Sequence, residues 1–195
     1  VLSGANSPSS LASWAIKYVF FDEVDKYPVF SGKEANPIKL ATERTKTFVD
    51  AKHVMVSTPT VENGNIWTAF KQAHAQKEYY VPCPHCGEYQ KLVFKQIKWP
   101  DEAKGNKDRI RDTAYYECVH CKKAIHDKHK MDMLRNGEWR TENDPDCRVR
   151  SVGYHLSSLY SPWIAFGKVA YEFFTSKDFP DQLMNFINSW LAAVS

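Results

Sequence analysis

Residues 17–25 read Lys-Tyr-Val-Phe-Phe-Asp-Glu-Val-Asp, a run of four large apolar or aromatic residues followed at once by two acids. An unbroken apolar run of this kind predicts a buried strand of a parallel sheet. A second run, His-Val-Met-Val-Ser at 53–57, ends in Thr-Pro-Thr at 58–60. Residues 36–49 between them mix apolar residues with charges, which suits a crossover helix. Together these segments predict a β-α-β unit.

Polar side chains follow both predicted strands, at the edge where open α/β sheets bind their ligands. An apolar strand followed by Asp-Glu is the pattern of a Walker B segment, in which the aspartate helps to hold Mg²⁺ and the glutamate orients the attacking water. Asp22 and Glu23 are therefore candidate catalytic residues, with Ser57 and Thr58 on the neighbouring strand end. Taken singly, each cluster has another interpretation, because strand-end acids also cap helices and Ser-Thr-Pro-Thr also forms plain turns.

The sequence contains no phosphate-binding loop of the form G-x-x-x-x-G-K-[ST]. Its two Gly-Lys pairs, at 32–33 and 167–168, are followed by Glu and Val. We therefore expect this chain alone to be inactive as an ATPase. Because it begins with Val1 and the phosphate loop of such domains precedes the acidic strand, we expect it to be an internal segment of a longer protein.

Cysteines form the most specific pattern in the sequence. Two C-x-x-C pairs, Cys83/Cys86 and Cys118/Cys121, are separated by 31 residues, the arrangement of a zinc ribbon. Disulfides or a redox pair are the alternatives, but there is no secretory signal and a redox motif needs one pair only. Four thiolate ligands leave no open position on the metal, so the zinc is expected to be structural.

Residues around the cysteines fit the same prediction. Gly87 follows the first pair and is suited to the positive φ of a knuckle, whereas Lys122 stands at the equivalent place in the second. His85 and His120 lie between better-placed thiolates and are expected to face solvent or to lie outside the ligand set. Cys147 is expected to be a free thiol.

Several further elements are predicted from local patterns. Segments 78–82, 89–94 and 114–117 are prone to form strands, and the polar stretch 101–108 between them predicts a loop. Asp127 is expected to cap a short helix that reaches Arg135 and ends at Asn136-Gly137.

The C-terminal stretch 164–193 has the spacing of two amphipathic helices, broken at Phe179-Pro180. His155 and Trp163, which precede it, are expected to pack in the core.

Composition excludes some classes of protein. A hydrophobic fraction of 43% argues against disorder, and the net charge of +3, from 26 basic and 23 acidic residues, permits contact with nucleic acid without arguing for it. We find no apolar run of the roughly 18 to 20 residues that a membrane span needs, and the first residues do not resemble a signal peptide. No membrane partner is expected, and the expected location is intracellular.

The sequence as a whole resembles the large terminase subunit of lambda-like tailed bacteriophages and prophages. The landmarks follow one another in family order: Gly4-Ala-Asn-Ser-Pro8, Tyr18–Asp25, Arg44-Thr-Lys-Thr-Phe48, Val56-Ser-Thr-Pro-Thr60, Val81–Gly87, Gly153-Tyr-His-Leu and Leu159-Tyr-Ser-Pro-Trp163. Because several independent motifs occur in order along nearly the whole chain, the resemblance is more specific than any single motif.

The resemblance implies an α/β fold of the ASCE-type P-loop NTPase class: part of a parallel sheet, an inserted zinc ribbon and C-terminal helices. It implies residues 1–76 as the later part of the ATPase core, 77–140 as the ribbon and 141–195 as a helical part of the ATPase domain. Asp22 and Glu23 take the Walker B roles, Ser57-Thr58 is similar to a motif that couples ATP hydrolysis to DNA movement, and Arg44 is a possible phosphate sensor. The nuclease domain that follows in this family is expected to be absent.

For the intact protein, the resemblance implies ATP hydrolysis coupled to translocation of double-stranded DNA into a procapsid, with Mg²⁺ and ATP as cofactors. The implied partners are DNA, the small terminase subunit, the portal and further copies of the chain, in the cytoplasm of a bacterial host. An alternative is a zinc-ribbon module without ATPase activity, which reads nucleic acid or a protein through Lys122, Lys123, Lys128 and Lys130. A helicase relative shares the acidic strand but does not account for the ribbon.

Overall fold

The computed structural model describes residues 3–5, 14–28, 36–143 and 145–194. Its strands are β1 (Tyr18–Asp22), β2 (Lys52–Val56), β3 (Ala75–Pro82), β4 (Tyr89–Lys91), β5 (Ile97–Lys98), β6 (Tyr115–Glu117), β7 (Ala124–Ile125), β8 (Glu138–Thr141) and β9 (Val152–His155). Its α-helices are α2 (Pro37–Glu43), α3 (Asn65–Gln72), α4 (Lys107–Thr113), α5 (Lys130–Arg135), α6 (Phe166–Ser176) and α7 (Pro180–Asn185), and α7 continues into the π-helical turn η6 (Phe186–Trp190). Residues 6–8 of the landmark at 4–8 and the Gly-Lys pair at 32–33 lie outside the described residues.

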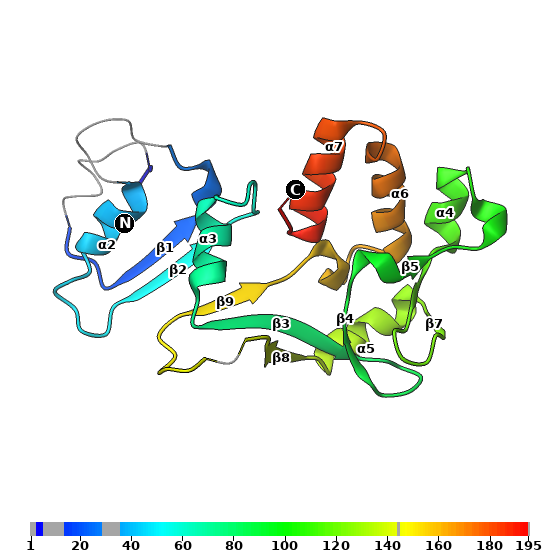
Figure 1. Cartoon of the computed structure of the whole chain (residues 1–195), viewed down its shortest axis with the longest axis horizontal. Coiled ribbons are helices and arrows are strands. Elements are labelled where there is room, and N and C mark those ends of the chain that lie inside the picture. Colours follow the sequence, from blue (N-terminus) through cyan, green and yellow to red (C-terminus); the bar gives the residue numbers. More distant parts are fainter. Residues whose placement is uncertain (1–2, 6–13, 29–35, 144, 195) are drawn as a thin grey trace.

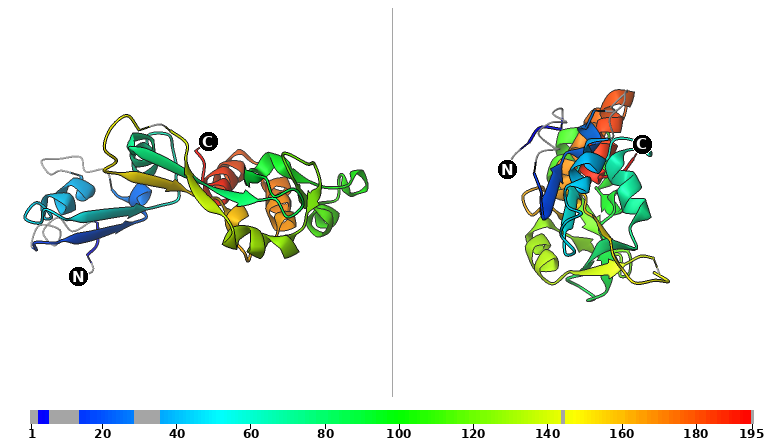
Figure 2. Two further views of the ribbon diagram at one scale, coloured as in Figure 1. Left: turned by 90° about the horizontal axis from the view of Figure 1, so that it is seen from below. Right: turned by 90° about the vertical axis from the view of Figure 1, so that its left-hand side faces the viewer.

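The predicted β-α-β unit is present at one end of an elongated molecule (Figures 1 and 2). β1 pairs with β2 in parallel, with Phe21 opposite Met55, and α2 connects the two strands. The Asn36 side chain accepts a hydrogen bond from the backbone N–H of Ile38 at 2.8 Å, so α2 begins with a conventional cap. One face of the two strands packs against α2 in a small core around Phe21, Val24 and Ala41.

The prediction that both strands are buried was wrong for the face of β1 and β2 that lies opposite α2. Phe20 is 77% exposed and Val56 is 57% exposed, and Tyr18 and Val54 on the same face are also open to solvent. A parallel strand normally reads as a continuous apolar run because helices cover both faces of its sheet. Here the sequence has that pattern, but within the described residues only the α2 face is covered.

A second sheet extends along the middle of the molecule. The long strand β3 pairs with β8 in antiparallel fashion along one edge, and with β9 in parallel and β4 in antiparallel fashion along the other. In Figure 1, β3 runs from α3 to the region of β4, so it joins the β-α-β unit to the remainder of the chain. The expected boundaries at 76/77 and 140/141 therefore fall inside β3 and β8 respectively.

The large core joins the cysteine region to the C-terminal helices. The cysteines of the two C-x-x-C pairs lie in two hairpins, β3–β4 and β6–β7. Fully buried side chains from the second hairpin, Tyr116 and Ile125, belong to the same cluster as Phe166, Val169 and Phe186 from the C-terminal segment. The two predicted amphipathic helices are confirmed as α6 and α7, which are separated by a short turn before Pro180. The cysteine region is thus one packed body with these helices.

Three local predictions were wrong. The segment 101–108 is not simply a loop, because Asn106 caps α4 by accepting from the N–H groups of Asp108 and Arg109. Asp127 does not cap its own helix; its carboxylate accepts from the N–H of Phe166 at 2.9 Å, at the start of α6. Trp163 is 91% exposed instead of packed.

Candidate metal centre and strand-end site

The four cysteines of the two C-x-x-C pairs converge on one point. Their Sγ atoms all lie within 4.8 Å of one another, with 3.8 Å between Cys83 and Cys121 and 3.9 Å between Cys86 and Cys118. A tetrahedral Zn–S₄ site with bonds of about 2.3 Å places its sulfurs roughly 3.8 Å apart. The cluster can therefore hold a metal ion of that size and preference.

The two knuckles that carry the cysteines have the same backbone design. In the first, the N–H of Gly87 donates to the carbonyl of Cys83 at 2.9 Å; in the second, the N–H of Lys122 donates to the carbonyl of Cys118 at 3.1 Å. Gly87 has φ 78° and Lys122 has φ 60°. The expected positive φ of Gly87 is thus confirmed, and Lys122 adopts the same left-handed conformation at a cost of roughly 1 kcal/mol relative to glycine.

The ionisation of the four thiols also suits the binding of a cation. Burial raises the pKa of the Cys83 thiol to about 12. Burial acts in the same direction on Cys118, but the backbone N–H groups of Cys121 and His120 donate to its sulfur and lower its pKa to about 6. Four thiols this close could all become thiolates only if a bound cation neutralised their charge, which is how thiolate metal centres are stabilised.

The histidines inside the knuckles connect the two hairpins. Nε2 of His85 lies 2.8 Å from the carbonyl oxygen of Ala124, and Nε2 of His120 lies 3.3 Å from that of Tyr89. Each ring therefore crosses from its own knuckle to the strand of the other, and both residues are exposed. This arrangement agrees with the expectation that they lie outside the ligand set.

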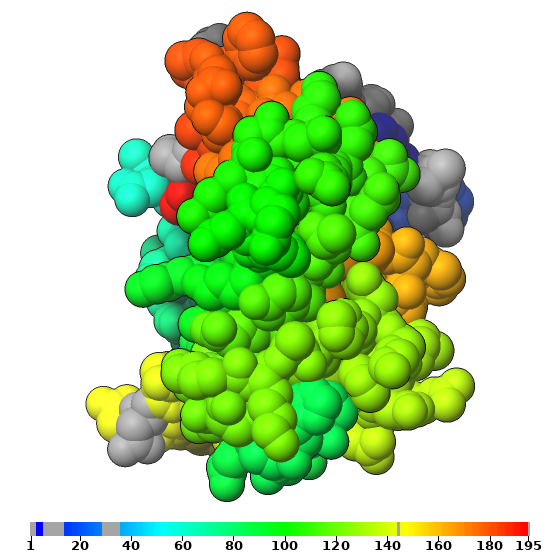
Figure 3. Space-filling model, turned by 90° about the vertical axis from the view of Figure 1, so that its right-hand side faces the viewer, coloured from blue at the N-terminus to red at the C-terminus, as the bar shows by residue number. Residues whose placement is uncertain are grey.

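Of the four lysines that the alternative zinc-ribbon module would use to contact nucleic acid or a protein, one is buried. Lys130 is 2% exposed, and its ammonium group donates to the carbonyl of Ser161 and lies over the Phe166 ring at 4.1 Å. Burial lowers its pKa to about 8. Lys122, Lys123 and Lys128 are exposed. The chain segments of this region are coloured green to yellow-green in the space-filling view of this end of the molecule (Figure 3). Lys130 holds the hairpins against α6 and is not available to a phosphate.

At the acidic strand end, Glu23 has an unusual backbone conformation. It has φ 53° and ψ 46°, the left-handed conformation, whereas Asp22 is the last residue of β1 and is exposed. Non-glycine residues held in this conformation cost about 1–3 kcal/mol and concentrate at functional sites. The carboxylate of Glu23 pairs with Lys26 at 3.0 Å.

Asp25 organises this strand end, a role that the sequence analysis missed. Its Oδ2 accepts from the N–H and hydroxyl of Thr60 at 2.9 and 3.1 Å, and its Oδ1 accepts from the N–H of Ile66 at 2.7 Å. The N–H of Asp25 donates to the hydroxyl of Ser57 at 3.2 Å. One carboxylate thus fixes the loop after β2 and the start of α3 against the end of β1.

The sequence signal for this role is the glycine that precedes α3. A Cβ on Gly64 would lie 2.4 Å from Oδ2 of Asp25, so no larger residue fits while the carboxylate stays in place. An acid two residues after the Asp-Glu pair, together with Gly64-Asn65 at a helix start, could have indicated the contact in advance.

A cavity of about 330 Å³ lies beside this strand end. Glu23, Ser57 and Thr58 line one side of it, so the structure brings these three predicted residues together. The opposite side is formed by the C-terminal part of the chain, including Ser157, Asn188 and Ala192. Its lining mixes hydroxyl, amide and carboxylate side chains with the apolar residues Val56, Pro59 and Leu156.

Arg44 is not brought to this cavity. Its carbonyl accepts from the N–H of Ile16 at 3.1 Å, which places its backbone beside the residues that precede β1. Asp22 lies six residues beyond Ile16, at the far end of β1 and on the order of 20 Å away at the rise of an extended chain. In this chain Arg44 is therefore separated from the acidic pair.

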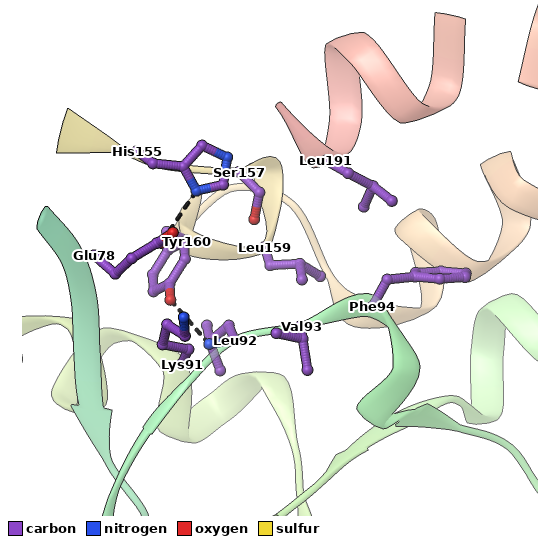
Figure 4. Close-up of a pocket in the computed structure, with 10 residues that line it drawn as sticks. All are labelled: Glu78, Lys91, Leu92, Val93, Phe94, His155, Ser157, Leu159, Tyr160 and Leu191. Atoms are coloured by element: carbon purple, nitrogen blue, oxygen red, sulfur yellow. Dashed lines mark hydrogen bonds and ion pairs between the residues drawn. The ribbon is translucent and has the colours of Figure 1, made fainter. Parts of the chain in front are cut away.

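A second, smaller cavity of about 190 Å³ lies between the central sheet and the C-terminal helices (Figure 4). On its wall, Nδ1 of His155 pairs with Glu78 at 3.1 Å, and its Nε2 bonds the carbonyl oxygen of Ala192 at 2.8 Å. The hydrogen bond to Glu78 raises the pKa of His155, against the opposing effect of burial. The expectation that His155 only packs was incomplete, because it forms a polar tie to the end of the chain.

Comparison with known families decides the wider assignment. Residues 1–139 match the family model described as the phage terminase large subunit gpA, ATPase domain. The chain belongs to the phage terminase large subunit family. Its residues 151–194 match a second model, the terminase large subunit gpA endonuclease domain.

Two curated relatives of this terminase chain are both described as the large subunit of a terminase. It is 28% identical over 194 residues to the large terminase subunit of Enterobacteria phage P21, covering 91% of the chain and 30% of that protein. It is 23% identical over 208 residues to the large terminase subunit of Escherichia phage lambda, covering 96% of the chain and 32% of that protein. The chain thus spans about a third of the length of these relatives. No solved structure matches it.

The two family matches meet within one packed body of the terminase chain. β9, which belongs to the endonuclease match, pairs with β3, which belongs to the ATPase match. The expected absence of any nuclease-domain sequence does not agree with the match at 151–194, although that match covers a short stretch. None of the described helices is long and apolar enough to cross a membrane.

Proposed function

We propose that this chain is part of a viral DNA-packaging motor that couples ATP hydrolysis to translocation of double-stranded DNA into a procapsid. The observation that carries the proposal is the grouping of Glu23 with Ser57 and Thr58 around one cavity, in a chain that matches a terminase ATPase domain over residues 1–139. Because the chain spans about a third of the length of its relatives, the proposed turnover is that of the full gene product in its assembly with the small subunit, the portal and further copies.

In the proposed mechanism, Asp22 would supply a carboxylate oxygen to Mg²⁺. Its position at the exposed end of β1 suits this, because Mg²⁺ prefers oxygen ligands and keeps several waters. When bound, the ion spreads charge off the phosphates of ATP. Glu23 orients and polarises the water that attacks the terminal phosphate, and its strained backbone holds the carboxylate at the edge of the cavity.

Ser57 and Thr58 are proposed to couple this site to DNA movement. The Ser57 hydroxyl bonds both the N–H of Asp25 and the carbonyl of Thr58, so a change at the acidic strand end reaches the loop after β2 directly. The site proposed for ATP thereby has a mechanical connection to the segments that follow β2.

We further propose that the four cysteines bind structural zinc in a zinc ribbon. Cys83, Cys86, Cys118 and Cys121 would complete the coordination sphere, which leaves the ion no position for a reactive water. The ion would hold the two hairpins together, and these hairpins share a core with α6.

Glu23→Gln in the intact gene product tests the motor proposal. The variant is expected to bind ATP but to lose turnover by at least about a hundredfold, because it keeps the metal ligand and removes the water-orienting carboxylate. Glu62→Gln, an exposed acid in the loop after β2, is the matched control and should hydrolyse ATP normally. Normal turnover in Glu23→Gln would refute the assignment.

A further inference from the structure

Asn188 lies on the far side of the strand-end cavity from Glu23, in the π-helical turn η6. It is only 8% exposed, and in the same turn it has the buried Phe186 and the half-buried Ile187 as neighbours. A buried amide costs free energy unless its polar atoms have partners, so its presence calls for a physical reason.

One half of this amide has a long-range partner. Nδ2 of Asn188 donates to the carbonyl of Thr60 at 2.9 Å, across 128 positions of sequence. Thr60 is also the residue that Asp25 holds through its N–H and hydroxyl. The loop after β2 is therefore held from both sides, by the acidic strand end and by the C-terminal segment.

The other half of the amide is unpaired. Oδ1 of Asn188 is buried and has no hydrogen-bond partner among the described residues. Leaving a buried acceptor unpaired costs roughly 1–3 kcal/mol, which an apolar residue at this place would avoid. Single π-helical turns are likewise uncommon and often lie at functional sites.

We infer that Asn188 is a positioning residue of the strand-end site: its amide holds the Thr60 loop against Asp25 and thereby sets the position of Glu23. The inference rests on the proposed ATPase function for its catalytic readout. It also means that a residue in the segment matched to the endonuclease model completes the support of a site in the segment matched to the ATPase model.

The first experiment uses this chain as it is. Hydrogen exchange at the amides of Thr60 and Ile66 is compared between Asn188→Ala and the matched control Asn185→Ala, an exposed asparagine in the preceding helix α7. Because both amides donate to Asp25, exchange is expected to quicken by about tenfold in Asn188→Ala only. Equal exchange in the two variants would overturn the inference.

The second experiment measures turnover in the intact gene product. Asn188→Ala and Asn188→Asp, which both remove the donor, are expected to lower kcat about tenfold with an unchanged KM for ATP. Asn188→Gln keeps an amide donor and should restore part of kcat. A general loss of folding would instead lower the melting temperature and raise KM, and that result would overturn the inference, as would kcat equal to that of Asn185→Ala.

Glu23→Gln in the same assay separates the two proposals. If Glu23→Gln is inactive and Asn188→Ala is normal, the positioning role fails and the motor proposal stands. If Glu23→Gln turns over normally, the motor proposal fails, and the exchange experiment alone decides whether Asn188 holds the loop.

Discussion

The cysteine region and the β1–β2 unit are both built around polar sites, but they reach their structure in different ways. The cysteine knuckles are closed by their own residues, and their hairpins share a core with α6 that contains fully buried Tyr116 and Phe166. The β1–β2 unit has a small core and leaves Phe20 and Val56 exposed. The first region can be stabilised locally by a metal ion, whereas the second depends on hydrogen bonds through Asp25 and on contacts from the far end of the chain.

Removing one of the proposed metal ligands should have the largest effect on this comparison. Cys118→Ser, or treatment with a strong chelator, is expected to unfold the hairpins and loosen α6, because structural zinc contributes roughly 10–16 kcal/mol of binding free energy in small zinc domains. The measurement is circular dichroism with zinc content by mass spectrometry. Cys147 is an exposed cysteine outside the cluster, so Cys147→Ser should change neither the circular dichroism spectrum nor the zinc content.

If hydrogen exchange in β1 and β2 rises as much as in the hairpins, the two regions unfold as one, and the contrast between them is wrong.

Removing the carboxylate of Asp25 should affect the other region by a smaller amount. Asp25→Ala loses three hydrogen bonds to a charged acceptor and is expected to destabilise the β1–β2 unit by about 3 kcal/mol. Urea denaturation measures this loss of unfolding free energy. Hydrogen exchange at the backbone amides of Thr60 and Ile66 shows whether it is located at the strand end. Asp22→Asn, an exposed acid at the same strand end, is expected to change stability by less than about 0.5 kcal/mol.

Zinc content is expected to stay constant in Asp25→Ala. A loss of zinc in that variant would mean that the strand end supports the cysteine region, contrary to the separation described above.

The smallest expected effect concerns His155, whose ties to Glu78 and Ala192 join the central sheet to the end of the chain (Figure 4). Since Glu78 raises the pKa of His155 in the folded protein, this stabilisation is complete below the unfolded pKa of about 6.5 and is lost as pH rises through the folded pKa. The unfolding free energy should therefore fall with rising pH over that range.

His155→Gln should abolish this pH dependence, and His126→Gln, an exposed histidine, should keep it. Identical pH profiles for the two variants would contradict the assignment to His155.

Patterns over a few residues were sufficient to predict the elements that depend on local chemistry. The spacing of the cysteines predicts their convergence, and Gly87 predicts the positive φ of its knuckle. The apolar spacing after residue 164 likewise predicts α6 and α7. These features depend on backbone conformation and helix periodicity, which neighbouring residues control.

Predictions that required knowledge of distant partners were less successful. Asp127 has the sequence of a local cap, but its carboxylate bonds Phe166 at the start of a different helix. Lys130 belongs to a run of lysines that suggests a solvated face, yet the protein buries it against α6. In each case the local pattern is compatible with a solvent-exposed or local role and with a contact to a distant segment. The segment that packs against the residue in the folded protein decides between them.

By itself the sequence determined the β-α-β order, the four-cysteine cluster, the acidic strand end and the family. Only the tertiary structure decided that Asp25 organises this strand end and that Asn188 supports the same loop from 128 positions away. The physical reason is that hydrogen bonds between distant segments leave no periodic trace in the sequence. Their donors and acceptors meet only after the hydrophobic core has brought the segments together.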